Sequence, residues 1–339
     1  MSEDVDSAPV SMREALNLAL MDLMESDDRV FLLGEDIADP MGGSYKVTAG
    51  LSTKFGEARV INSPISETAI VGAGIGSALV GRRPIVELMY IDFVTVAMDQ
   101  LVNQAAFLSY MSGGQTSVPL VVRCQGGSMR SSAAQHSKSL EAWFAHVPGI
   151  KFVAPTTVND AYWLLRAAVE DPNPVIFFEE NRLYRQKGEL DRSRRPVDLY
   201  RPCIRLEGAD VTLVAWAGGV GTALEVAGEL KSLRGISAEV IDLRWVAPLD
   251  LSVVLESVEK TNRLVVIQEA WRAFGVGAEI AASVSETMFH RLRMPVMRFG
   301  SAHCPHPFSP ILEKAMQPTI SEIASAIAEG FTAGGAEVT

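Results

Sequence analysis

The sequence predicts two doubly wound α/β domains joined by a charged linker. Short runs that are apolar on both faces, such as RVFLLG and PIVELMY, alternate with helical periodicity, as in parallel sheets covered on both sides. The alternation is interrupted once by a charged stretch containing two prolines, and then it restarts. At 339 residues the chain is also long enough to form two separate cores.

The first domain is expected to open with a helix, because Ser11 and Glu14 form a capping box ahead of ALNLALMDLM. The runs RVFLLG, PIVELMY, VPLVVRC, KFVAP and PVIFFEE predict strands. Between them, DFVTVAMDQLVNQAAFLSYM and NDAYWLLRAAVE predict helices. We assign residues 1–185 to this domain.

The stretch from Glu179 to Pro202, EENRLYRQKGELDRSRRPVDLYRP, has the charge and proline content of an interdomain connection. We place the linker itself at residues 186–202. Beyond it, DVTLVAWAG, AEVIDLRWV, RLVVIQEA and PVMRFG predict the strands of a second domain, residues 203–339.

Composition excludes several classes of partner. The chain has 30 Lys and Arg against 41 Asp and Glu, so its net charge of −11 does not favour binding to nucleic acid. No uncharged apolar run approaches the length of about 18 residues that a membrane span needs. The cysteines are far apart and the acidic N-terminus has no signal pattern, so we expect a reduced, cytoplasmic protein.

The glycine-rich stretch from Ser63, SPISETAIVGAGIGSALVG, poses the main functional question. It does not have the G-x-G-x-x-G spacing of a dinucleotide loop, because the position three after Gly74 is Ser77. The favoured interpretation is a helix whose small residues permit close packing. Glu67, at its start, is either an acid that complements the helix dipole or a desolvated carboxylate that handles protons.

His136 stands in a polar loop after the strand VPLVVRC, where α/β proteins place reactive groups. His146, ten residues later, is interpreted as a helix-terminating residue. No Walker loop, H-E-x-x-H or G-x-S-x-G motif is present in the sequence.

Six stretches occur in an order that resembles a known family: PISETAIVGAGIGSALVGRRPIVELMYIDF, DQLVNQAAFLSYMSGG, AAQHSKSLEAWFAHVPGIKFVAP, DPNPVIFFE, FGVGAEIAASV and PHPFSPILE. The family is that of the beta subunits of thiamine-diphosphate-dependent 2-oxo acid dehydrogenases, which act on pyruvate, branched-chain 2-oxo acids or acetoin. The resemblance implies a thiamine-diphosphate pyrimidine-binding domain followed by a transketolase C-terminal-like domain. These two domains agree with the two α/β halves that the alternation of strands and helices predicts.

The resemblance also implies roles for individual residues. The glutamate of P-I-x-E, here Glu67, hydrogen-bonds a ring nitrogen of the cofactor's aminopyrimidine and promotes the tautomer that accepts a proton. Phe93 lies against that ring, and Ile65 and Met89 line its pocket. His136 handles protons or orients substrate and the incoming lipoyl group.

Some members of the family bind a structural potassium ion, and the resemblance places its ligands at Leu120, Ala168, Val169, Asp171 and Asn173. Oxygen ligands suit such an ion, although the DPNP sequence is also an ordinary turn before a strand. The chain departs from the family pattern at Lys138 and Arg130, which leaves the preferred acyl substrate open.

The diphosphate end of the cofactor is expected from another chain. In the family a G-D-G segment binds the Mg²⁺ that holds the diphosphate, and this sequence contains no Gly-Asp pair. The resemblance therefore implies a heterotetramer of two alpha and two beta chains, which passes an acyl group to a lipoyl-bearing acyltransferase core. Two other interpretations stay open: one half of a split transketolase, and a non-catalytic assembly subunit in which Glu67 only complements a helix dipole.

Overall fold

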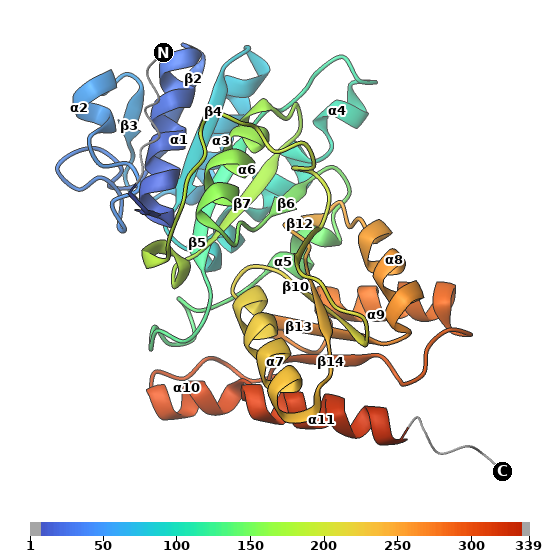
Figure 1. The fold of residues 1–339 in the computed structure, drawn as a ribbon. Helices are drawn as coiled ribbons and strands as arrows, with labels where there is room; N and C mark the ends of the chain where they lie inside the picture. The colour runs from blue at the N-terminus through green and yellow to red at the C-terminus, as the bar shows by residue number, and fades with distance from the viewer. Residues whose placement is uncertain (1–7, 334–339) are drawn as a thin grey trace, which may run out of the picture. The chain divides into compact units, whose positions relative to one another are not determined.

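The computed structural model describes residues 8–333, which divide into two compact units (Figure 1). The first unit holds the residues up to Gln125 together with Val147–Leu199. The second holds Gly126–His146 and the chain from Tyr200 onward. The segment Gly126–His146 thus groups with the second unit, whereas the sequence placed it inside domain 1–185; the domain bounds 1–185, 186–202 and 203–339 stay a prediction.

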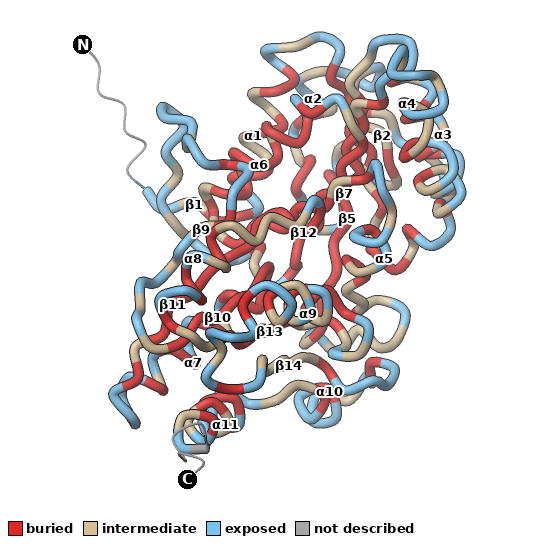
Figure 2. Tube along the Cα trace, turned by 90° about the vertical axis from the view of Figure 1, so that its right-hand side faces the viewer, coloured by how far each residue is buried: buried red, intermediate tan, exposed pale blue. Residues whose placement is uncertain are grey.

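The first unit contains one large parallel sheet. Its strands are β2 (Val30–Gly34), β3 (Val60–Asn62), β4 (Arg83–Leu88), β5 (Val121–Gly126), β6 (Lys151–Val153) and β7 (Val175–Glu180). They are ordered β6-β7-β5-β4-β2-β3. Helices α1 (Met12–Ser26) and α6 (Val158–Glu170) lie on one face and α3 (Glu67–Leu79) on the other, so both faces are covered (Figures 1 and 2). The strands β5 and β7 are buried throughout, as parallel strands covered on both sides should be.

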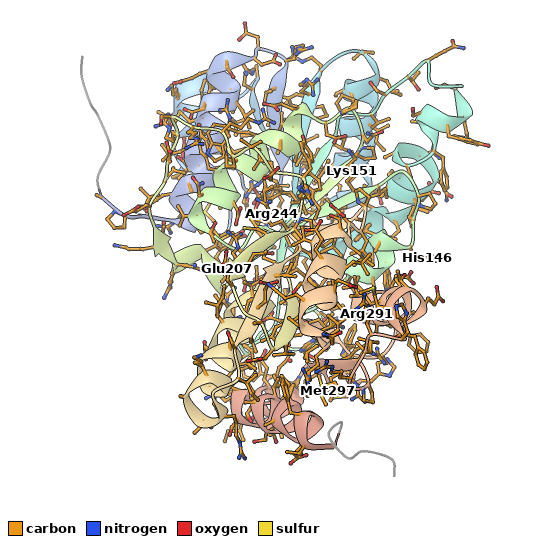
Figure 3. The ribbon with its side chains drawn as sticks, turned by 45° about the vertical axis from the view of Figure 1, so that its right-hand side comes forward. His146, Lys151, Glu207, Arg244, Arg291 and Met297 are labelled. Atoms are coloured by element: carbon orange, nitrogen blue, oxygen red, sulfur yellow. The ribbon has the colours of Figure 1, made fainter. Side chains whose placement is uncertain are left out.

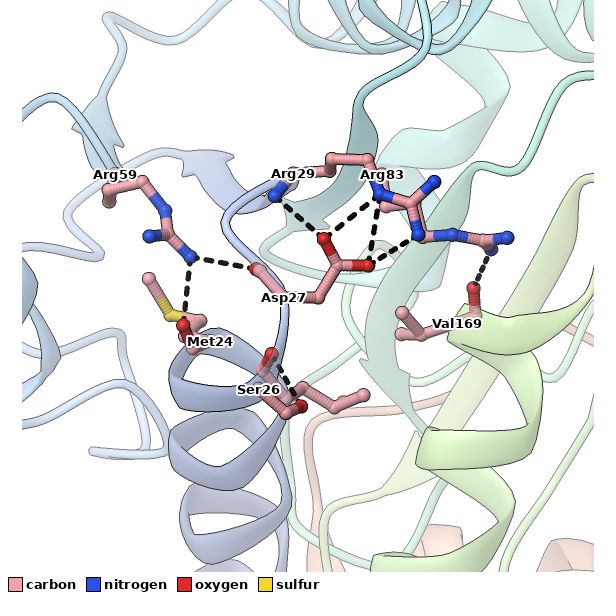
Figure 4. Close-up of polar contacts among 8 residues, drawn as sticks. Met24, Ser26, Asp27, Arg29, Arg59, Arg83 and Val169 are labelled. Carbon is pink, nitrogen blue, oxygen red and sulfur yellow. Dashed lines mark hydrogen bonds and ion pairs between the residues drawn. The ribbon is translucent and has the colours of Figure 1, made fainter.

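Helix α1 begins as the sequence predicts and ends in a group of ionic contacts. The Ser11 hydroxyl accepts from the Glu14 amide at 3.3 Å, and the Glu14 carboxylate accepts from the Ser11 amide at 2.7 Å. At the other end, Arg59 donates to the Met24 and Asp27 carbonyls, both at 3.1 Å (Figure 4). The bonds from Arg29 lower the pKa of the Asp27 carboxyl to about 2. The two hydrogen bonds between Ser11 and Glu14 confirm the predicted capping box.

The glycine-rich segment forms helix α3, and only one of its glycines is required by close packing. A Cβ on Gly74 would lie 2.9 Å from Val86 of β4 and 2.9 Å from Leu120, which directly precedes β5. A Cβ on Gly76 would meet nothing within 4 Å. The close-packing interpretation is correct for Gly74 and wrong for Gly76, which faces away from the sheet.

The segment predicted as one helix over DFVTVAMDQLVNQAAFLSYM is helical but irregular. It forms a 3₁₀ helix, Ile91–Ala97 (η1), a π-helix, Asp99–Ala105 (η2), and a short α-helix, α4 (Leu108–Met111). The Thr95 hydroxyl donates to the Asp92 carbonyl at 2.8 Å, and the Thr68 hydroxyl of α3 donates to the Val96 carbonyl at 2.8 Å. Both hydroxyls thus bond to backbone carbonyls of the irregular segment, which a Thr in a helix can do.

The charged stretch is only partly a connection. Glu179 and Glu180, where the sequence suggested that it begins, belong to β7 and are 1% exposed each. Further on, β8 (Lys187–Gly188) pairs antiparallel with β1 (Val10–Ser11). Glu179 therefore belongs to the predicted strand PVIFFEE and not to the charged connection, although the charged stretch was taken to begin there.

The second unit contains a sheet ordered β14-β13-β10-β11-β9. Its strands are β9 (Cys203–Leu206), β10 (Val211–Ala215), β11 (Ala238–Asp242), β13 (Leu264–Trp271) and β14 (Met297–Ser301). Val211 and Leu213 of β10 join the apolar core beneath α7 (Gly219–Arg234) and α11 (Ile320–Ala333). Thr212 points the other way and hydrogen-bonds Ser257 of α8 (Ser252–Thr261) at 2.7 Å. Both units are therefore doubly wound, as predicted.

The remaining helices and strands of the second unit are α5 (Glu141–Ala145), β12 (Trp245–Ala247), α9 (Val276–Met288) and α10 (Pro310–Met316). A 3₁₀ turn, Leu183–Arg185 (η3), and α2 (Leu51–Phe55) complete the first unit. Within residues 8–333, no helix combines the length and the apolar character needed to cross a bilayer.

The two glycines of α3 offer a matched test of helix packing. Gly74→Ala should lower the free energy of unfolding by about 1–3 kcal/mol, because the new methyl group overpacks Leu120 and Val86. Gly76→Ala should raise it by up to about 1 kcal/mol, because alanine favours the helix and meets nothing. Urea unfolding of both variants measures the difference; equal effects would contradict the packing account.

Candidate cofactor and active site

The predicted pyrimidine-site residues of the first unit lie at the carboxyl edge of its sheet. Glu67 is the first residue of α3, which follows β3, and Met89 directly follows β4. The carboxyl ends of parallel strands meet at one edge, which is where open α/β sheets bind ligands. Phe93 lies on η1, which begins shortly after Met89. The hydrogen bond from the Thr68 hydroxyl to the Val96 carbonyl links η1 to the start of α3. The fold therefore brings the elements that carry these residues together.

Glu67 is half-buried and occupies the first turn of α3, where the helix dipole favours a negative charge. A second carboxylate, Glu35, follows β2 at the same edge, and the sequence interpretation missed it. Burial raises the pKa of Glu35, and the negative charges of Asp36 and Glu67 raise it further. Its position directly after the strand RVFLLG was the signal that could have found it.

The other predicted pocket residues differ in exposure. Phe93 is half-buried and packs edge-on against Tyr90, with ring centroids 6.0 Å apart. Met89 is half-buried and lines a cavity of about 10 Å³ together with Tyr45 and Gln125, with room for about one water molecule. Ile65 is 74% exposed. Ile65 is therefore the most open of the predicted pocket residues.

A buried ionic network lies beneath this cavity. The Arg123 guanidinium of β5 donates to both Glu179 oxygens, at 2.6 and 2.8 Å, and to Glu87 of β4 at 2.6 Å. The Tyr184 hydroxyl donates to Glu179 at 2.6 Å. Burial opposes the Arg123 charge, but Glu179 and Glu87 outweigh it and raise the Arg123 pKa. Burial also raises the pKa of Glu87.

Three buried amide atoms next to the network have no hydrogen-bond partner among the described residues. They are the Gln125 carbonyl oxygen and both polar atoms of Asn181, and the two residues are 5% and 6% exposed. Buried polar groups are rarely left unpaired, so such groups mark places where a ligand or water is bound. The sequence interpretation did not select either residue.

His136 belongs to the second unit, so it is described separately from Glu67. It lies half-buried in the loop between β5 and α5, and the loop is closed by a bond from the Gly127 amide to the Lys138 carbonyl at 3.2 Å. The neighbouring Ser137 is fully buried. His146 ends helix α5, as expected, its amide bonding back to Ala142 (Figure 3).

The five predicted potassium ligands gather around the end of α6. Ala168 and Val169 lie in its last turn, Asp171 ends it, and the Leu120 carbonyl accepts the Val175 amide at 2.9 Å. Cationic side chains already occupy part of this cluster. Lys151 pairs with the Asp171 carboxylate, and Arg83 donates to the Val169 carbonyl (Figure 4).

Known proteins match the chain over nearly its whole length. A family described as transketolase, pyrimidine binding domain matches residues 8–187, and one described as transketolase, C-terminal domain matches residues 203–323. The pyruvate dehydrogenase E1 component subunit beta of Rhizobium meliloti is 42% identical over 95% of this chain and 70% of its own length. The acetoin:2,6-dichlorophenolindophenol oxidoreductase subunit beta of Bacillus subtilis is 43% identical over 94% of this chain and 96% of its own.

Among solved structures, a split-gene transketolase described as an inactive beta4 tetramer superposes with a TM-score of 0.78. It covers 96% of this chain and 99% of its own, at 22% sequence identity, and so it supports the fold only. The two units are thus those of transketolase-type thiamine enzymes. The chain belongs to the family of beta subunits of thiamine-diphosphate-dependent 2-oxo acid dehydrogenases, enzyme components that work with an alpha subunit.

Arg123→Met tests how far the first unit depends on the buried network. Removal of the guanidinium leaves Glu87 and Glu179 as neighbouring buried carboxyl groups, which should lower the free energy of unfolding by about 3–5 kcal/mol. The matched control is Arg29→Met, because Arg29 is 57% exposed and pairs with Asp27 at the surface. Denaturant unfolding should show a far smaller effect for the control; similar losses would contradict a special role for Arg123.

Proposed function

We propose that this chain supplies the aminopyrimidine side of a thiamine diphosphate site in an enzyme that decarboxylates a 2-oxo acid or cleaves acetoin. The observation that carries the proposal is the position of Glu67. It starts a helix at the carboxyl edge of a parallel sheet, close enough to Glu35 for its charge to affect the pKa of that residue. A carboxylate at such an edge is well placed for proton exchange.

When bound, thiamine diphosphate supplies an electron sink for the carbanion left when a 2-oxo acid loses carbon dioxide. Glu67 would share a proton with a ring nitrogen of the aminopyrimidine, as a general acid–base residue. Phe93 would present its ring to the pyrimidine, and Met89 and Ile65 would line the pocket. The Gln125 side-chain oxygen and the Asn181 amide, which lack partners among the described residues, would add polar groups at the same edge.

His136 would handle protons for the substrate or for the lipoyl group that receives the acyl chain. An imidazole is suited to this task because its charge changes near neutral pH. His136 also lies in a loop that follows strand β5 rather than in a regular element. Lys138, whose carbonyl closes the same loop, would change the charge around His136, which leaves the preferred acyl substrate open.

The diphosphate and its Mg²⁺ would be held mainly by an alpha subunit. Clustered negative charges need a strong positive counterpart, and the sequence has no Gly-Asp pair with which to begin the family's metal motif. The assembly would be a heterotetramer of two alpha and two beta chains that delivers acyl groups to a lipoyl-bearing acyltransferase core.

A potassium ion at the end of α6 is a further part of the proposal. The last carbonyls of a helix lack intrahelical partners and carry partial negative charge, which suits a cation. The Asp171 carboxylate is already engaged by Lys151 and by the Asn173 amide at 2.9 Å. The ion would therefore rely on backbone carbonyls, such as those of Leu120 and Ala168, rather than on that carboxylate.

The acyl substrate is not selected by similarity, because a pyruvate and an acetoin relative are 42% and 43% identical to the chain. Dye reduction by the reconstituted complex with pyruvate, branched 2-oxo acids and acetoin would select among them. Ketol transfer between sugars would instead support a split transketolase. Absence of both activities in a correctly assembled complex would support a non-catalytic subunit.

Glu67→Gln tests the proton role. The amide keeps the shape of the side chain but has no acidic proton to share, so turnover of the complex should fall by about 10²- to 10⁴-fold. The control is Glu57→Gln, an exposed glutamate in the same unit, which should retain full activity. Near-normal turnover of a folded Glu67→Gln complex in the dye assay would overturn the role of Glu67.

A further inference from the structure

One buried carboxylate binds three consecutive backbone amides in the loop that leads to His136. Glu313 of α10 accepts from Met129 at 2.6 Å and from Arg130 at 3.2 Å through one oxygen, and from Ser131 at 2.8 Å through the other. The side chain reaches across 184 positions of the sequence and is 2% exposed. Hydrogen bonds to a charged acceptor are stronger than neutral ones, especially where water is excluded.

The loop has an unusual backbone at these positions. Met129, Ser131 and Ala133 have φ values of 67°, 54° and 61°, in the left-handed region that non-glycine residues avoid. Left-handed residues that alternate with right-handed ones can turn successive N–H groups toward one side, where they form a site for an anion. In this loop the anion is the Glu313 carboxylate, and its bonds offset the cost of the strained conformation.

The restrained segment is connected to His136 by further hydrogen bonds. The His136 amide donates to the Ala133 carbonyl at 3.4 Å, and Ala133 is two residues after the last amide that Glu313 binds. Gly127 and Lys138 close the loop on either side. The backbone of His136 is therefore set by a segment whose conformation depends on Glu313.

Helix α10 is itself firmly placed, so it can serve as the fixed end of this arrangement. The Met316 carbonyl at its end accepts the Ala302 amide at 2.9 Å, and Gln317 donates to the Glu269 carbonyl at 3.0 Å. Figure 1 shows α10 beside the loop that precedes α5.

We propose that Glu313 is a positioning residue, which holds the loop of residues 129–133 in its strained form and thereby orients His136. This inference rests on the proposed role of His136. The carboxylate has the charge and the two acceptor oxygens needed for three donors. An amide in its place would keep one acceptor and would turn an NH₂ group toward backbone N–H groups.

The test uses Glu313→Gln in the reconstituted alpha–beta complex, with hydrogen exchange and steady-state kinetics as readouts. Amides 129–131 should exchange faster, and kcat should fall between about 10- and 100-fold, as expected for a misplaced catalytic group. The KM for thiamine diphosphate should stay within about twofold, since misplacement of His136 affects the reaction rather than cofactor affinity. Glu313→Asp keeps the charge and both oxygens, so it should recover part of the rate, and it replaces Glu313→Gln if that variant does not assemble.

The matched control is Glu322→Gln. Glu322 also accepts a backbone amide, that of Thr319 at 2.7 Å, but on the exposed start of α11. This variant should leave both loop exchange and kcat unchanged. Unchanged loop exchange in a folded Glu313→Gln complex would overturn the proposal. If His136→Ala lowers kcat, then faster loop exchange with an unchanged kcat in Glu313→Gln would overturn it as well.

His136→Ala, measured in parallel, separates this inference from the proposed function. If His136→Ala leaves turnover unchanged, the role of His136 is wrong. Hydrogen exchange alone then tests whether Glu313 holds the loop. Faster exchange of amides 129–131 in Glu313→Gln supports that role, and unchanged exchange overturns it.

Discussion

A single buried arginine holds the central strands of the first unit together directly beneath the predicted cofactor edge. Arg123 of β5 binds Glu87 of β4 and Glu179 of β7, and a buried charge network of this kind is favourable only while every member stays paired. Alternate residues of a strand share a face. Met89, Gln125 and Asn181 each lie two positions after one of these residues, in the order Glu87, Arg123 and Glu179. The network thus lies two positions before one predicted pocket residue and before the two residues whose buried amide atoms lack partners among the described residues.

The proposed pyrimidine site would need a further surface to cover it. Ile65 is 74% exposed and Glu67 only half-buried, although a proton shared between a carboxylate and a ring nitrogen needs water to be excluded. The same conclusion follows from the charge of the ligand, because the sequence has no family motif for the metal that would hold the diphosphate. A site completed at a subunit interface accounts for both observations.

The sequence predicted local structure well and missed long-range pairing. The capping box at Ser11, both doubly wound sheets and the helix after Glu67 followed from periodicity and spacing. The charged stretch was taken to begin at Glu179, but this residue is buried in β7, and its partner Arg123, 56 positions away, could not be found from the sequence. The same limit hid the bonds from Glu313 to the His136 loop, while Gly76 was misjudged because glycine spacing does not show which face of a helix is covered.

The most direct test of the shared-site account is calorimetric titration of thiamine diphosphate and Mg²⁺ into this chain alone and into the co-purified alpha–beta complex. Little or no heat of binding is expected for the isolated chain, because its sequence lacks the Gly-Asp pair that begins the family's metal motif. Saturable binding is expected for the complex, with one cofactor for each alpha–beta pair. Tight stoichiometric binding to the isolated chain would contradict the shared site.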